Sequence, residues 1–140
     1  MRVVVDTNVF VSSLLNTEGN PRKVIDLWRF EKITLCISKE ILEEYVEVLG
    51  RVGLEGTPEL KELLDLFSGA PNILFTSKTP EIHAVPDDHD DDKFIACALA
   101  LEAEVIITGD KALEAVGFYS DIRISNPSRF LADFKRNVKC

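Results

Sequence analysis

The chain has 140 residues, of which 46% are hydrophobic and 29% are charged, and its formal net charge is -8. This length and composition suit one globular domain with a real core and exclude an intrinsically disordered chain. No apolar run approaches the roughly 20 residues that a helix needs to cross a membrane. The negative net charge also excludes nucleic-acid binding that is driven by overall charge alone.

The cysteines and the first residues bear on where the protein works. Cys36, Cys97 and Cys140 form no close pair. An odd number of cysteines without framework spacing predicts a reducing, cytoplasmic setting and argues against a structural zinc site. Residues 1–15 lack the long apolar core of a secretory signal, so we expect them to be part of the folded protein.

Short apolar runs alternate with helical patterns along the chain. Strands are expected at residues 2–6, 33–37, 72–77, 104–110 and 122–127. Helices are expected at residues 7–15, 21–30, 39–52, 58–67, 90–101, 111–117 and 128–137, with Asn20 and Ser38 as caps of the second and third. Strands separated by helices throughout predict a parallel sheet with helices on both faces. We see no repeat or linker and expect one domain over residues 1–140.

Two of the expected strands end in an aspartate, namely Asp6 and Asp110. In open parallel sheets the binding crevice lies at the carboxyl ends of the strands, so both side chains are candidates for a site. An aspartate at a strand end is also a routine helix cap, and for Asp6 alone that interpretation is at least as good.

Glu44 stands out in the helix that follows Ser38. The apolar stripe of this helix contains Ile41, Tyr45, Val48, Leu49 and Val52. Glu44 lies at the border of that stripe. A carboxylate there either extends to solvent or faces a cleft as a ligand, and the periodicity favours neither.

Residues 87–92 hold five aspartates in six positions, directly before an apolar helix. The positive end of a helix dipole favours aspartate in the first turn, and this accounts for one or two of the five. Helix phase places Asp91 on the same face as Phe94 and Ile95, whereas Asp92 projects nearer Leu99. At least one carboxylate of the run is therefore expected to point toward the core.

Four carboxylates are candidates for one cluster: Asp6, Glu44, Asp91 and Asp110. Such a cluster would repel itself unless a hard divalent cation neutralised it. Oxygen ligands of this kind suit Mg²⁺ or Mn²⁺, and the matching chemistry is hydrolysis of a phosphodiester by metal-bound water. No Ser-His-Asp or Cys-His arrangement and no Gly-rich phosphate loop competes with this interpretation.

With these residues in place, the sequence resembles the PIN-domain nucleases over nearly its whole length. The resemblance rests on the segments "VVVDTNVFVSSLL", "ISKEILEEYVEVL", "DHDDDKFIACALALEAEVIITGD" and "IRISNPSRFL". It is closest to the VapC-like toxins of toxin–antitoxin pairs. The resemblance implies a three-layer α/β/α sandwich with a mostly parallel central sheet of about five strands. It also implies a ribonuclease that depends on Mg²⁺ or Mn²⁺.

Carried over to this sequence, the resemblance makes Asp6, Glu44, Asp91 and Asp110 the catalytic and metal-binding quartet. Family members differ by one residue in the spacing of the third acid, so Asp88 or Asp92 could take or share that role. Helix phase favours Asp91 among the three.

Four further residues are expected around the quartet. Asn8 and Thr108 would support it through hydrogen bonds, as the resemblance implies. Lys93 and Lys111 each lie one or two residues from a proposed ligand, and we expect them to contact RNA phosphates.

Two functions are compatible with these features. The first is a metal-dependent endoribonuclease, the toxin of a type II toxin–antitoxin pair, with RNA as substrate. Its expected partners are an antitoxin protein and further copies of the chain in a homodimer or higher homo-oligomer, with no membrane association. The alternative is a PIN-fold binding or assembly module with little or no catalysis, which would bind metal without turnover.

Overall fold

A computed structural model describes residues 1–53, 56–70, 72–82 and 91–138 of the chain. The strands are β1 (Arg2–Val5), β2 (Thr34–Ser38), β3 (Ile73–Thr76), β4 (Val105–Ile107), β5 (Phe118–Tyr119) and β6 (Ile122–Ser125). The helices are α1 (Thr7–Leu15), α2 (Asn20–Arg29), α3 (Lys39–Arg51), α4 (Pro58–Gly69), α5 (Asp92–Ala100), α6 (Lys111–Val116) and α7 (Pro127–Val138). The described elements follow the predicted order, with boundaries shifted by a few residues.

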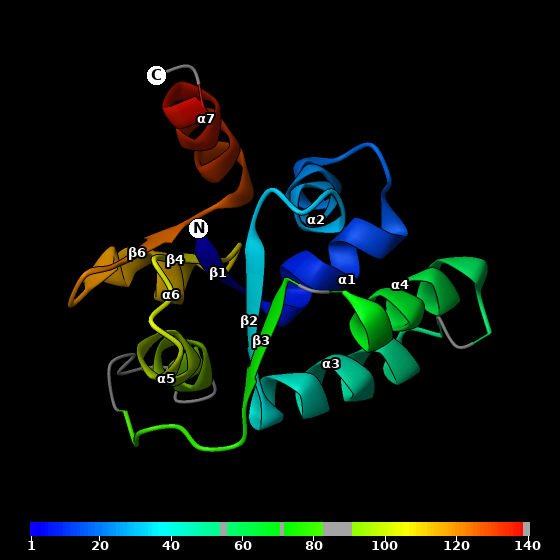
Figure 1. The fold of residues 1–140 in the computed structure, drawn as a ribbon, viewed down its shortest axis with the longest axis horizontal. Helices are drawn as coiled ribbons and strands as arrows, with labels where there is room; N and C mark the ends of the chain where they lie inside the picture. The colour runs from blue at the N-terminus through cyan, green and yellow to red at the C-terminus, as the bar shows by residue number, and fades with distance from the viewer. Residues whose placement is uncertain (54–55, 71, 83–90, 139–140) are drawn as a thin grey trace.

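The strands form one sheet in the order β3-β2-β1-β4-β6-β5. Neighbouring strands are parallel except for the last pair, in which β5 runs antiparallel to β6. Helices α5 and α6 lie on one face of the sheet, and α1, α2 and α7 lie on the other (Figure 1). The predicted α/β fold with a mostly parallel sheet is confirmed. The short strand β5 adds a sixth strand to the five that were expected.

The first strand lies at the centre of the sheet, between β2 and β4. Its valines Val3, Val4 and Val5 are buried on both faces, as a continuous apolar run predicts. Because a central strand ends in the middle of the sheet edge, the residue after Val5 is surrounded by the ends of its neighbours.

Aromatic packing fixes where α3 lies against α1. The rings of Phe10 and Tyr45 stack with their centroids 4.4 Å apart and their planes 14° from parallel. Phe67 of α4 packs on Phe10 and also on Trp28 of α2, with centroid distances of 5.6 Å and 5.3 Å. This buried cluster holds the first half of α3 beside the start of α1.

The helix starts follow the predicted caps with one exception. The Ser38 hydroxyl accepts a hydrogen bond from the backbone N–H of Ile41 at 3.2 Å, as predicted for α3. Helix α2 instead begins at Asn20 itself, with Gly19 as the cap residue and no capping side chain. Pro21 then occupies the first turn, where its missing N–H costs nothing. In the described part of the chain, no helix is long and apolar enough to span a membrane.

Candidate active site

Asp6 follows the central strand directly and is buried, with 4% of its surface exposed. Both carboxylate oxygens accept hydrogen bonds: Oδ1 from the backbone N–H of Asn8 at 3.3 Å, and Oδ2 from the hydroxyl of Thr108 at 2.6 Å. Asp6 therefore caps α1 and also lies at the edge of the sheet where the parallel strands end. The two interpretations that the sequence left open are compatible with each other.

Thr108 and Asp110 follow the neighbouring strand β4. The Thr108 hydroxyl, besides donating to Asp6, accepts from the backbone N–H of Asp110 at 2.9 Å. Asp110 caps α6 through Oδ1, which accepts from the N–H groups of Ala112 at 2.8 Å and Leu113 at 3.4 Å. One oxygen therefore serves the helix, and the other takes no hydrogen bond within the described residues.

Glu44 points toward α1 and α5, because one group from each of these helices binds its carboxylate. The Thr7 hydroxyl of α1 donates to Oε2, and the Lys93 ammonium of α5 lies 2.7 Å from Oε1. Lys93 was expected to contact RNA phosphates, but the structure engages it with Glu44, near the ring of Phe94. Lys111 is exposed at the first position of α6, where the expectation remains open.

The acidic run is described only from Asp91 onward, so Asp88 lies outside the described residues. Asp91 precedes the first residue of α5, and Asp91 and Asp92 are both buried, with 7% and 6% of their surfaces exposed. Asp92 lines a cavity of about 400 Å³, together with Glu40 of α3 and residues 79–82. Helix α5 begins two residues later than expected, so Asp91 lies just outside the helix whose phase was used to place its side chain.

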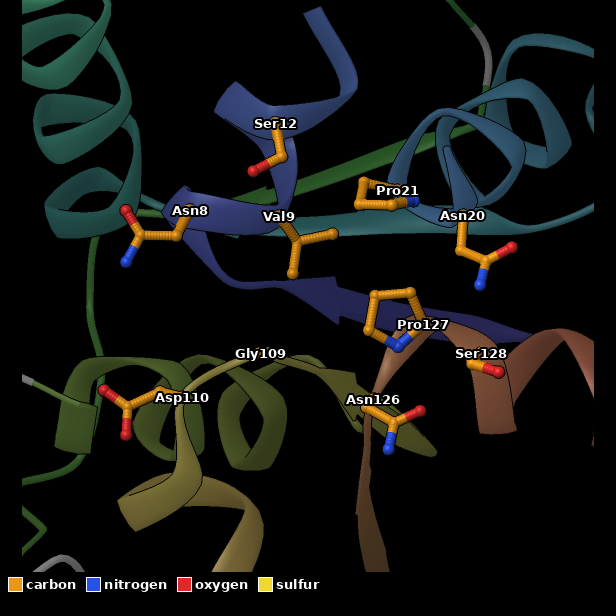
Figure 2. Close-up of a pocket in the computed structure, with 10 residues that line it drawn as sticks. All are labelled: Asn8, Val9, Ser12, Asn20, Pro21, Gly109, Asp110, Asn126, Pro127 and Ser128. Atoms are coloured by element: carbon orange, nitrogen blue, oxygen red, sulfur yellow. The ribbon is translucent and has the colours of Figure 1, made fainter. Parts of the chain in front are cut away.

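Asn8 supports Asp6 through a hydrogen bond from its backbone. Its backbone N–H binds Asp6, whereas its side chain is exposed and lies across from that of Asp110 (Figure 2). Thr7, which holds Glu44, is a residue that the sequence analysis missed. Its position directly after Asp6 at the start of a helix is the only signal that could have identified it.

The acidic groups at this edge act on one another. Burial raises the pKa of Asp6 above its ordinary value of 3.8, although the hydrogen bonds from Thr108 and Asn8 oppose the shift. The charges of Glu44 and Asp110 raise the pKa of Asp6 further. The carboxylates of Glu44 and Asp110 are therefore each close enough to Asp6 to repel it.

Tyr45 is buried close to the carboxylates of Asp6 and Glu44. Its hydroxyl is buried and donates to the backbone carbonyl of Val5. Burial raises the pKa of Tyr45 well above 10.0, and the charges of Asp6 and Glu44 add to the shift. The phenol is therefore neutral and serves as a fixed donor that ties α3 to the end of β1.

The carboxylate oxygens at this edge are the ligands that hard divalent cations prefer. Within the described residues, no three His, Cys, Asp or Glu side chains are close enough together to hold an ion by themselves. Magnesium, however, keeps several of its waters and is commonly bound by one or two carboxylates. A cation at this edge would be held by one or two of these carboxylates together with water, and it would relieve the repulsion that Glu44 and Asp110 exert on Asp6.

The fold and this edge together define an α/β protein with an acidic site at the carboxyl ends of its central strands. A family model described as "PIN domain" matches residues 2–112, so the chain belongs to the PIN domain family. This membership indicates a nuclease-type function, and nucleases of this family generally use divalent metals.

One curated relative extends over nearly the full chain. "Uncharacterized protein MJ1680" of Methanocaldococcus jannaschii is 31% identical to this chain over 154 residues. The alignment covers 99% of this chain and 94% of the relative. The similarity therefore extends well beyond residue 112, where the match to the family model ends.

Proposed function

We propose that the protein is a metal-dependent endoribonuclease that hydrolyses RNA phosphodiester bonds. The observation that supports the proposal is that Glu44 and Asp110, which belong to two other elements, are close enough to Asp6 to raise its pKa. The raised pKa of Asp6, to which both other charges contribute, supports a site that is completed by a cation.

The residues have separate tasks in this proposal. Asp6, held by Thr108, and Asp110 would present oxygens to the cation, and Glu44 is positioned by Thr7. A bound Mg²⁺ or Mn²⁺ would supply a nucleophilic water and positive charge for the leaving oxygen.

Two further contributions belong to the same proposal. The fourth acid is Asp91, with Asp92 or Asp88 as the alternative, and Lys111 contacts a phosphate of the RNA.

The biological setting is also part of the proposal. The resemblance to VapC-like toxins over nearly the whole length of the chain supports a single domain over residues 1–140 that acts in the cytoplasm as the toxin of a toxin–antitoxin pair. An antitoxin protein and a second copy of this chain are then the expected partners.

A binding or assembly module remains the second candidate, and one contact favours it. Lys93 already neutralises Glu44, with Nζ 2.7 Å from Oε1. A site whose carboxylate is paired within the protein has less need of a cation, and such a module would bind RNA or protein without cleaving it.

Cleavage of a structured and an unstructured RNA in Mn²⁺, Mg²⁺ or EDTA separates the two candidates. We expect wild type to cleave only with metal, and Asp6→Asn and Glu44→Gln to lose at least a hundredfold in rate. Glu47→Gln is the matched control, because Glu47 lies on the same helix with 68% of its side chain exposed. Equal faint cleavage by all four proteins would mean contamination and would leave the binding module as the function.

A further inference from the structure

A cavity of about 580 Å³ opens beside the acidic edge. Four elements of the fold contribute to it: α1, the start of α2, the turn between β4 and α6, and the turn into α7. Its lining residues are Asn8, Val9, Ser12, Asn20, Pro21, Gly109, Asp110, Asn126, Pro127 and Ser128 (Figure 2). The turn into α7 lies beyond residue 112, where the family model ends.

The lining has an unusual chemistry for a chain of net charge -8. Val9, Pro21 and Pro127 give it apolar surface, and the asparagines and serines give it uncharged donors and acceptors. Asp110 is the single charged residue among those that line it. A nucleobase has the complementary properties, since it is flat and uncharged with stackable faces and hydrogen-bonding edges.

The position of the cavity connects it to the acidic edge. The side chains of Asn8 and Asp110 lie across from each other at one end of the cavity (Figure 2). Asp110 therefore belongs both to the acidic edge and to the lining of the cavity. A nucleotide whose phosphate lies at the acidic edge could direct its base into the cavity, whose volume is in the range typical of small-ligand pockets.

The polar side chains of the lining differ in how far they are already engaged. Asn126 accepts from the backbone N–H of Arg129 at 2.8 Å and donates to Glu114 at 2.9 Å, so its amide is committed to the fold. Asn20 and Ser128 are exposed, and their side chains make no hydrogen bond within the described residues. They stand on opposite walls, at the starts of α2 and α7.

We propose that this cavity binds one nucleobase of the RNA, that of the nucleotide adjoining the scissile phosphate. Asn20 and Ser128 bind the edge of the base, and the two prolines contact its faces. The inference rests on the proposed ribonuclease function and adds a base-recognition site to it. The protein then cleaves RNA with a sequence preference that is set by residues outside the acidic centre.

The first test is direct binding of the four ribonucleoside 5′-monophosphates to the metal-free protein, followed by amide NMR. We expect one nucleotide to shift the amide signals of Ser12, Gly109 and Ser128, and the double variant Asn20→Ala/Ser128→Ala to weaken that binding about tenfold. The variant Asn16→Ala/Ser77→Ala removes the same groups outside the lining and should bind as wild type does.

The second test uses RNA with an abasic residue beside the cleaved bond. We expect the abasic residue to lower kcat/KM of wild type about tenfold or more. The double variant should show the same loss on normal RNA and little further loss on abasic RNA, because both changes remove one interaction.

The outcomes distinguish this inference from the function on which it rests. Wild type that cleaves normal and abasic RNA equally, with no nucleotide-induced shift at the lining, would overturn the base site and leave the ribonuclease. Nucleotide shifts at the lining without any RNA cleavage would support the base site and overturn the ribonuclease.

Discussion

Replacing Lys93 by methionine removes the charge that faces Glu44 and keeps a side chain of similar length. The side chains of Lys93 and Glu44 are 17% and 27% exposed, and their charged atoms are 2.7 Å apart. An exposed ion pair contributes about 0–1 kcal/mol, whereas breaking a fully buried one costs about 3–5 kcal/mol. This half-buried pair lies between the two cases. We expect Lys93→Met to lower the free energy of unfolding of the metal-free protein by about 2 kcal/mol.

Denaturant unfolding in EDTA measures this change, with fluorescence as the probe. Trp28 is the single tryptophan and is buried, so its emission reports the loss of the core. Arg51→Met is the matched control, because Arg51 and Glu47 form a 2.6 Å pair on α3 with both side chains 68% exposed. We expect the control to change stability by less than about 1 kcal/mol.

Divalent cation adds a second measurement on the same variant. If Mn²⁺ neutralises Glu44 in place of Lys93, then millimolar Mn²⁺ should stabilise Lys93→Met more than wild type, and the difference between them should shrink. Equal losses in Lys93→Met and Arg51→Met would refute the role of Lys93 as counter-ion. A gap that Mn²⁺ leaves unchanged would argue against a cation site at Glu44.

Three other measurements test separate parts of the structure. Because burial raises the pKa of Asp6 above 3.8, ionisation of this group opposes folding as the pH rises. Metal-free Asp6→Asn should therefore melt at a higher temperature than wild type at neutral pH. The difference should fade as the pH falls from the raised pKa of folded Asp6 toward 3.8, and it should be absent below 3.8. Burial also raises the pKa of Cys36 to about 11 and that of Cys97 to about 12, so iodoacetamide at neutral pH should label both only after unfolding, as peptide mass spectrometry would show. Asn72 donates to the carbonyls of Trp28 at 2.7 Å and Ile33 at 2.9 Å, and Asn72→Ala should lower the free energy of unfolding by about 2 kcal/mol in the same denaturant assay.

Most of the fold could be predicted because local signals agree with the tertiary structure. Apolar runs mark the buried strands, and Ser38 marks the start of α3. The strand β5 left no such signal. It has two residues, and it exists because the turn at Ser120, with φ of 54°, returns the chain onto β6.

The acidic edge was predictable only in part. Topology alone places Asp6 and Asp110 together, because parallel strands end at one edge. Whether the Glu44 carboxylate faces solvent or a neighbouring helix depends on what packs against α3. Helical periodicity holds no information about these neighbours, so it could not predict the contacts of Glu44 with Thr7 and Lys93. The phase argument for Asp91 assumed that this residue lies inside α5. Because Asp91 is instead the cap that precedes Asp92, the rotation of about 100° per helical residue does not place its side chain.

The hydrogen bond between Thr108 and Asp6 joins residues that are 102 positions apart. During synthesis, ribosomes add about 5–20 residues per second, so roughly 5–20 seconds pass between the appearance of Asp6 and that of its partner. The strand β4, which completes the pairing of β1, appears at the same late stage. A nascent chain therefore carries the first acid long before the acidic edge can assemble. If the protein cleaves RNA, this order of assembly protects the message and the ribosome that are making it.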